Sequence, residues 1–201
     1  MDEVQGIKYW NTPSIRYDQT ENSFESFTEK LLARYHVHVG NLVSCGASAC
    51  ATLAEGMGWL RPEDYPQING KSIQFDDFIM AYMNDPRNNF TQDPLVFDNE
   101  IIKNYVDLIR DLFGKESVYR RNINFKNTAS NLCMGNGVQL CMIDPGHFVA
   151  AVSYDHSDNS IIYLDSRKLP GTIYKKFYPA DFSNIMSYGI VYLKEEGEYE
   201  G

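Results

Sequence analysis

Long apolar runs are missing from this sequence of 201 residues, and their absence limits where the chain can work. No run approaches the roughly 20 consecutive apolar residues that a membrane-spanning helix needs. The N-terminus also lacks the basic region and apolar core of a signal peptide. We therefore expect a protein without a transmembrane segment, either cytoplasmic or released without a signal peptide.

Positive charge is scarce as well. The chain has 18 Lys and Arg residues against 27 Asp and Glu residues, which gives a formal net charge of −9. Such a chain repels a phosphate backbone unless its basic residues gather in one patch, and no basic patch appears in the sequence. Nucleic acid is therefore not an expected partner.

Cysteine is present but shows no paired pattern. The four cysteines are Cys45, Cys50, Cys133 and Cys141. None belongs to a Cys-x-x-Cys pair, and four cysteines in a chain of this length do not suggest a disulfide framework. A reducing compartment suits them, although their even number leaves disulfide bonds open.

Histidine is equally rare, and a metal-binding spacing is absent. The four histidines are His36, His38, His147 and His156. The first two would share one side of an extended segment, where they could pair as metal ligands, but no further ligand follows at a recognisable spacing. We expect these two to be surface or loop residues, and we expect no metal ion and no cofactor.

The sequence does contain enough apolar material for one core. Hydrophobic residues make up 43% of the chain and aromatic residues 13%, so we expect one domain over residues 1–201, with loose termini at 1–14 and 195–201.

The apolar spacing divides the chain into a helical half and a strand half. Helical spacing, together with one stretch rich in Ala and Gly, predicts helices at 23–35, 45–57, 73–84 and 99–113. Strand patterns are found at 118–125, 138–143, 146–155, 161–165, 172–178 and 188–193. Helices first and strands afterwards predict an α+β fold, in which the helical N-terminal half packs on a C-terminal antiparallel sheet.

The residues around Cys45 predict a nucleophile. Ser44 can cap the helix that starts there, and the free N–H groups of the first turn place partial positive charge beside the Cys45 sulfur. This position favours the thiolate, the nucleophilic form of cysteine. Cys50 is the rival thiol, but it lies more than one turn from the helix start, where the dipole effect has decayed. We expect Cys50 to pack in the core.

His147 belongs to a strand whose neighbour ends in an acid. The strand stops at a cluster of turn formers, and a second strand at 161–165 follows, which predicts a β-hairpin. With the turn centred near His156, His147 lies opposite Asp165 and their Cβ atoms are roughly 5 Å apart. The carboxylate would then orient the imidazole, and with Cys45 the three would form a nucleophile, a base and an orienting group.

These features together resemble the papain-like cysteine peptidases of the C39 and C39-like group. That family has a Cys-Gly-Pro-x-Ser/Ala start, followed later by Gly-His-Phe-Val-type and Asp-Pro strands. Here Cys-Gly-Ala-Ser at 45–48 has Ala where Pro is usual, and Asp-Ser at 165–166 has Ser where Pro is usual. Neither change removes a reacting group. The resemblance covers about residues 15–193 and implies a papain-like fold.

The resemblance also implies a donor to the oxyanion. Ile-Arg-Tyr-Asp-Gln at 15–19 is similar to a Tyr-x-x-Gln-like stretch that the family places ahead of its cysteine, and the Gln side chain there donates to the oxyanion. We assign this role to Gln19, beside the backbone N–H of Cys45. Alternatively, Gln19 is an exposed polar residue of a loop and has no catalytic role. Asn41 is the other candidate donor, nearer in sequence but without the flanking resemblance.

The expected function is hydrolysis of a peptide or isopeptide bond through an acyl-enzyme thioester. Taken singly, Cys45, His147 and Asp165 each have a structural explanation, but their joint pattern favours catalysis. The same triad runs acyl transfer in transglutaminase-like and arylamine acetyltransferase-like proteins, and it could act on a cell-wall peptide, as in small phage lysins. A non-catalytic peptide-binding relative of the fold is the alternative of another class. The expected partner is a peptide or a peptide-containing substrate, including a peptidoglycan stem peptide.

Overall fold

The computed structural model of the chain describes residues 3–11, 17, 45–61, 67–68, 71–72, 75–84, 99–166 and 174–195. These residues combine helices with an antiparallel β-sheet, so the predicted α+β class is confirmed. The elements are β1 (Val4–Gly6), α2 (Cys45–Gly56), β2 (Gln67–Ile68), β3 (Lys71–Ser72), α3 (Phe75–Asn84), α4 (Asn99–Phe113), β4 (Ser117–Arg120), α5 (Phe125–Cys133), β5 (Gly137–Met142), β6 (His147–Asp155), β7 (Ser160–Leu164), β8 (Lys175–Phe177), the 3-10 helix η6 (Pro179–Asn184) and β9 (Ile185–Tyr192).

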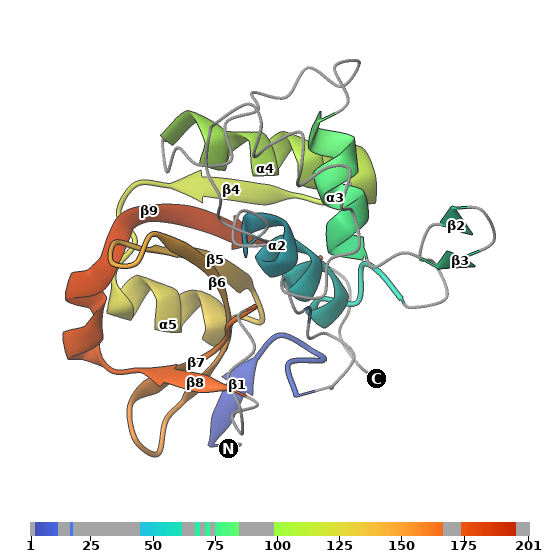
Figure 1. Cartoon of the computed structure of the whole chain (residues 1–201). Coiled ribbons are helices and arrows are strands. Elements are labelled where there is room, and N and C mark those ends of the chain that lie inside the picture. Colours follow the sequence, from blue (N-terminus) through green and yellow to red (C-terminus); the bar gives the residue numbers. More distant parts are fainter. Residues whose placement is uncertain are drawn as a thin grey trace.

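Seven of the strands form one antiparallel sheet. The strand order is β4-β9-β5-β6-β7-β8, and β1 pairs with β6 (Figure 1). Helices α2, α3 and α4 lie on one side of this sheet and α5 lies on the other (Figure 1). The short strands β2 and β3 form a separate ladder. Covered on both faces, β5, β6 and β7 are buried along almost their whole length.

Successive residues of the central strands alternate between two apolar clusters. Phe148 and Ala150 of β6 pack in the cluster that contains α2, whereas Val149 and Ala151 pack in the cluster that contains Leu132 of α5. Side chains of a strand point to opposite faces in turn, so both faces of β6 have to be apolar. This explains why the strand appears in the sequence as a continuous apolar run.

Helix α2 is enclosed by other elements. Each of its 12 residues is buried, and it packs against β6 and α3. The hydroxyl of Ser48 donates to the buried carboxylate of Asp76 in α3 over 2.8 Å, and the hydroxyl of Thr52 donates to the Ser48 carbonyl. The Ala, Gly and Ser residues of α2 allow these close contacts. The helix begins at Cys45, as predicted, and places that residue at its N-terminus.

Most of the other predicted elements are present, with shifts at their ends. Helix α4 spans 99–113 as predicted, and α3 ends at the predicted residue, Asn84. Strand β8 is shorter than the strand expected at 172–178, and β9 begins earlier than the strand expected at 188–193. The helix expected at 23–35 lies outside the described residues.

The strand predicted at 118–125 is wrong in its second part. Only its beginning belongs to β4, and helix α5 starts at Phe125. The side chain of Asn124 caps this helix by accepting a hydrogen bond from the N–H of Asn127 over 2.9 Å. Phe125 and Leu132 lie on its apolar side. Both the cap and the helical spacing are present in the sequence, but the predicted strand extends over the residues that begin the helix.

Residues 3–11 were expected within a loose N-terminus, but Val4–Gly6 form strand β1 of the sheet. Strand β1 pairs with the end of β6, and the N–H of Ile7 donates to the Val152 carbonyl over 2.9 Å. The Ile7 side chain is fully buried. The sequence pattern does not predict β1, because the residues around it are mostly polar. An edge strand of this kind depends on backbone hydrogen bonds more than on apolar side chains. Residues 196–201 lie outside the described residues.

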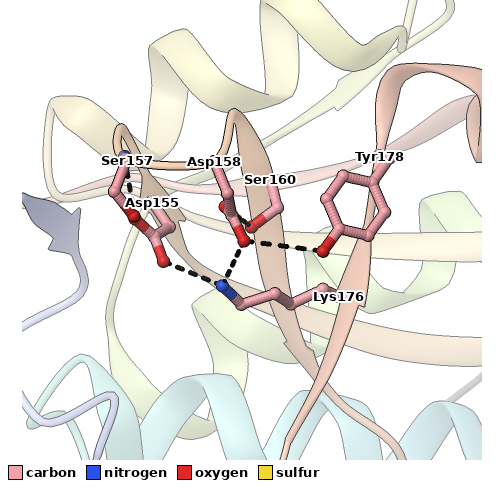
Figure 2. A network of polar contacts seen from close by, with 6 residues as sticks. All are labelled: Asp155, Ser157, Asp158, Ser160, Lys176 and Tyr178. Carbon is pink, nitrogen blue, oxygen red and sulfur yellow. Dashed lines mark hydrogen bonds and ion pairs between the residues drawn. The ribbon is translucent and has the colours of Figure 1, made fainter.

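Lys176 of β8 closes the turn between β6 and β7 with two ion pairs (Figure 2). Its Nζ lies 2.9 Å from Asp155 Oδ2 and 2.6 Å from Asp158 Oδ2. The N–H and hydroxyl of Ser157 donate to Asp155, and the hydroxyl of Ser160 donates to Asp158. Hydrogen bonds from Ser157 and then Lys176 lower the pKa of Asp155 to about 2, and the bond from Lys176 also lowers the pKa of Asp158.

We predict that Lys176→Met lowers Tm by roughly 2–4 °C at about pH 6, because two carboxylates lose their cation. The pKa values of Asp155 and Asp158 are depressed on folding. Their stabilising effect is therefore present above about pH 4 and is lost as the pH falls towards 2. Thermal unfolding followed by circular dichroism should show the difference between wild type and variant shrinking over this range. Lys126→Met, at an exposed position of α5, is the control and should unfold like wild type. A difference that stays the same at low pH would contradict this prediction.

Candidate active site

Cys45 and His147 each lie at the first residue of an element. Cys45 begins α2 and His147 begins β6, and the two elements pack against each other. Cys45 is 5% exposed and His147 is 1% exposed. The Cys45 sulfur is close enough to the imidazole to act on the pKa of the ring. The fold thus brings together two residues that are far apart in the sequence.

The structure also brings His147 and Asp165 together, although not through the predicted strand pairing. His147 Nε2 lies 2.6 Å from Asp165 Oδ1. In the hairpin, however, Ala150 pairs with Leu164, so Asp165 lies beyond the last pair of the ladder. The turn lies at 156–159, further along the chain than expected, and the register shifts again at a bulge between Ala151 and Ser153. The side chains, rather than opposed strand positions, make the contact.

This contact determines which ring nitrogen can serve the thiol. A carboxylate accepts hydrogen bonds, so the Nε2 that faces Asp165 carries a proton whether the ring is neutral or charged. The other nitrogen, Nδ1, is buried and has no hydrogen-bond partner of ordinary geometry among the described residues. Nδ1 is therefore the nitrogen that can exchange a proton with Cys45.

The surroundings of His147 favour its charged form. Burial lowers the pKa of the ring, but the hydrogen bond to Asp165 and the hydrogen bond and negative charge of Cys45 act in the opposite direction. The pKa of His147 is raised above its ordinary value as a result. The imidazolium therefore persists to higher pH than it would on a free histidine, as a thiolate–imidazolium pair requires.

Lys175 is a member of this site that the sequence did not reveal. Its Nζ lies 2.5 Å from Asp165 Oδ2, the carboxylate oxygen that does not face His147. Lys175 belongs to β8 and pairs with Tyr163 of β7. Its contact with Asp165 depends on the register between these two strands. Two adjacent lysines in a short strand carry no signal of that register, so the pattern could not have identified the pair.

A buried polar network joins the first turn of α2 to the sheet. The side-chain amide of Gln139 in β5 donates to the Gly46 carbonyl over 3.3 Å, and its oxygen accepts from the Tyr192 hydroxyl over 2.6 Å. The Tyr192 hydroxyl also contacts the thiol of Cys50. Such networks stabilise one arrangement of the elements that they connect. The available signal for Gln139 was a lone polar residue in an apolar strand.

Gly46 permits the close approach of Tyr105 to the start of α2. A Cβ atom at position 46 would lie 2.3 Å from the Tyr105 hydroxyl oxygen and 3.0 Å from the ring carbon that bears it. Tyr105 belongs to α4, is buried, and packs on Phe148 with ring centroids 6.2 Å apart. Only glycine fits beside Cys45 in this packing, so Gly46 has a structural reason that is independent of catalysis.

The other three thiols are not partners of the His147 ring. Burial raises the pKa of Cys50 and of Cys141 to about 12, and Cys50 packs in the core as predicted. Cys133 is exposed, with its sulfur 3.8 Å from Nε2 of His156. All four cysteines are described and free, so the disulfide bonds that the sequence left open are not formed. Cys45 is the thiol positioned for chemistry with His147.

Several candidates from the sequence lie outside the described residues. They are the oxyanion candidates Gln19 and Asn41, the helix cap Ser44, and the histidines His36 and His38. Tyr17, in the same short motif as Gln19, is described, and its hydroxyl donates to Glu55 of α2 over 2.8 Å. The role of Gln19 stays a prediction.

Metal ligation and membrane crossing find no support in the described part of the chain. Within it, no three His, Cys, Asp or Glu side chains gather as a metal-binding group would require. None of its helices has the length and apolar character needed to cross a membrane.

Comparison of the chain with protein-family models and with curated proteins gives no match.

We predict that Gly46→Ala lowers the free energy of unfolding by about 1–3 kcal/mol, because the new methyl group meets the Tyr105 hydroxyl. Tyr105→Phe removes this oxygen, so the double variant should be more stable than the sum of the two single changes predicts. Urea unfolding of wild type, both single variants and the double variant measures the coupling. Strictly additive losses would show that the close approach does not explain the glycine.

Proposed function

We propose that this protein is a thiol-dependent hydrolase with a papain-like fold, which cleaves a peptide or isopeptide bond. The observation that carries the proposal is the buried line of interactions from Cys45 through His147 to Asp165. Covalent acyl chemistry needs a nucleophile, a base and an orienting acid in this arrangement. The order of the three along the chain, and the packing of the cysteine helix on an antiparallel sheet, agree with the resemblance to C39-like peptidases.

In the first half of the reaction, the Cys45 sulfur attacks the carbonyl carbon of the scissile amide. The thiol proton has passed to Nδ1 of His147, and Asp165 stabilises the resulting imidazolium through the Nε2 proton. Attack forms a carbon–sulfur bond and a tetrahedral oxyanion. On collapse the carbon–nitrogen bond breaks, Nδ1 donates its proton to the leaving amine, and a thioester remains on Cys45.

In the second half, water hydrolyses the thioester. Nδ1 of His147, now without its proton, accepts one from the attacking water. The carbon–sulfur bond breaks, the carboxylic acid product leaves, and the thiolate–imidazolium pair is restored.

The oxyanion needs hydrogen-bond donors in both halves of the reaction. Cys45 is the first residue of α2, and the N–H groups of a first helical turn have no partner within the helix. The Cys45 N–H is one donor in this proposal, and the side-chain amide of Gln19, or that of Asn41, is the other.

The acceptor of the acyl group separates hydrolysis from acyl transfer. The similarity of the local motifs to the peptidases favours water over an amine. A screen of a peptide library and of peptidoglycan fragments, with and without an added amine, identifies both the bond and the acceptor. Cleavage confined to stem peptides would identify a cell-wall peptide hydrolase.

The test of the proposal compares the two thiols of α2. Cys45→Ala should abolish turnover and leave the fold intact. Cys50→Ala should keep turnover but lose roughly 1 kcal/mol of stability, because it removes a fully buried sulfur. Measured kcat values and urea midpoints with the opposite pattern would assign the nucleophile to Cys50.

Alkylation within the same test separates an enzyme from a non-catalytic peptide-binding module. It is best done in a Cys133→Ser background, because Cys133 is exposed. Iodoacetamide should modify Cys45 stoichiometrically and spare Cys50 and Cys141, as peptide mapping would show. His147→Ala should slow this labelling at neutral pH. A Cys45 that stays unlabelled would favour the binding module.

A further prediction concerns the pH dependence of the reaction. Asp165 raises the pKa of His147, so Asp165→Asn should lower that pKa. Because the mechanism needs the imidazolium, the basic limb of the kcat/KM profile should move to lower pH. The loss of charge should also reduce kcat by about 10²-fold to 10⁴-fold without unfolding the protein. A basic limb at the wild-type position would show that the carboxylate does not act on the ring.

A further inference from the structure

Each carboxylate oxygen of Asp165 faces a basic side chain. His147 Nε2 is 2.6 Å from Oδ1, and Lys175 Nζ is 2.5 Å from Oδ2. The Asp165 side chain is 10% exposed and that of Lys175 is 28% exposed. The ammonium group thus lies at the rim of the site, with the carboxylate between it and the buried ring.

Strand β8 holds Lys175 in place through its neighbours on the same strand. Phe177 stacks on Tyr163 of β7, with ring centroids 3.8 Å apart and an interplanar angle of 8°. Lys176 is bound to the carboxylates of Asp155 and the hairpin turn (Figure 2). The backbone position of Lys175 is therefore fixed from both the core side and the turn side of the strand.

A carboxylate that orients an imidazole has to keep one orientation and stay ionised. The terminal torsion of an aspartate is broad, so each bond to its oxygens narrows the range of orientations that the carboxylate can take. A second charge-assisted bond on the other oxygen restricts this rotation. The nearby cation also favours the ionised form of a carboxylate that is largely removed from water.

We propose that Lys175 is a positioning residue, which holds Oδ2 of Asp165 and so keeps Oδ1 on the His147 ring. Lys175 acts through Asp165 and not on the substrate. The inference rests on the proposed function, in which Asp165 orients the base. A purely structural ion pair between β7 and β8 is the alternative that the experiment has to separate from it.

The first measurement needs no substrate. Proton NMR of the wild-type protein should show the downfield resonance of the His147 Nε2 proton, which is hydrogen bonded to a carboxylate and shielded from water. His147→Ala identifies this resonance by removing it. Lys175→Met should shift it upfield or broaden it, because the carboxylate loses the cation on its Oδ2, and Lys175→Arg should restore it. Lys126→Met, at an exposed position of α5, is the control lysine and should leave it unchanged.

The second measurement uses turnover. Lys175→Met should lower kcat by about tenfold to a hundredfold with little change in KM, because the base is misplaced rather than lost. In an Asp165→Asn background the same change should have no further effect on kcat, since the carboxylate it positions has lost its charge. Lys175→Gln replaces the Met variant in both measurements if circular dichroism shows that the latter does not fold.

The outcomes separate this inference from the proposed function. An unchanged Nε2 proton resonance in Lys175→Met, or a kcat loss that adds in full to that of Asp165→Asn, would overturn the inference. A resonance that Met disrupts and Arg restores supports it even in a protein that hydrolyses no amide bond. In that last case the proposed function would fall and the positioning of Asp165 by Lys175 would stand.

Discussion

The hydrogen bond between the His147 ring and the Asp165 carboxylate is the contact on which the rest of the site depends. Its two groups lie at the open end of the β6–β7 hairpin, so the contact exists only while that hairpin keeps its register. A carboxylate removed from water needs compensating charge, which the ring and Lys175 supply. At the other end of the hairpin, Asp155 and Lys176 fix the turn. One strand, β6, therefore carries the candidate base at its first residue and a structural ion pair at its last.

Close packing around α2 supplies the second half of the site. A cysteine can face a histidine on the sheet only if the helix that carries it lies near the strands, and bulky side chains would prevent this. Because Gly46 has no side chain, Tyr105 can pack against this turn. The side-chain amide of Gln139 in the sheet hydrogen-bonds to the Gly46 carbonyl of the same turn. The small residues of α2 thus serve the packing, and the position of the thiol follows from it.

Features set by neighbouring residues could be predicted from the sequence, whereas features set by distant pairing could not. Helix α4 was found from its regular apolar repeat, and α2 was found from its stretch rich in Ala and Gly. The hairpin was found from its turn formers, but its register was not, because the turn lies at 156–159 and a bulge between Ala151 and Ser153 shifts the pairing. The position of Lys175 and the presence of strand β1 both depend on pairing with residues far along the chain, so neither was predicted. Helix α5 is a different case. Its cap, Asn124, is a local signal in the sequence, so this helix could have been predicted.

The spacing of His147 and Asp165 has a consequence for how this chain can change in length. The two residues are 18 positions apart, and the hairpin between them is held by ion pairs at its open end and at its turn. Inserting or deleting one residue in β7 would turn each following side chain to the opposite face of the sheet and take the carboxylate off the ring. A chain that keeps this contact can therefore change length outside residues 147–165, whereas within 147–165 only substitutions are compatible with the site.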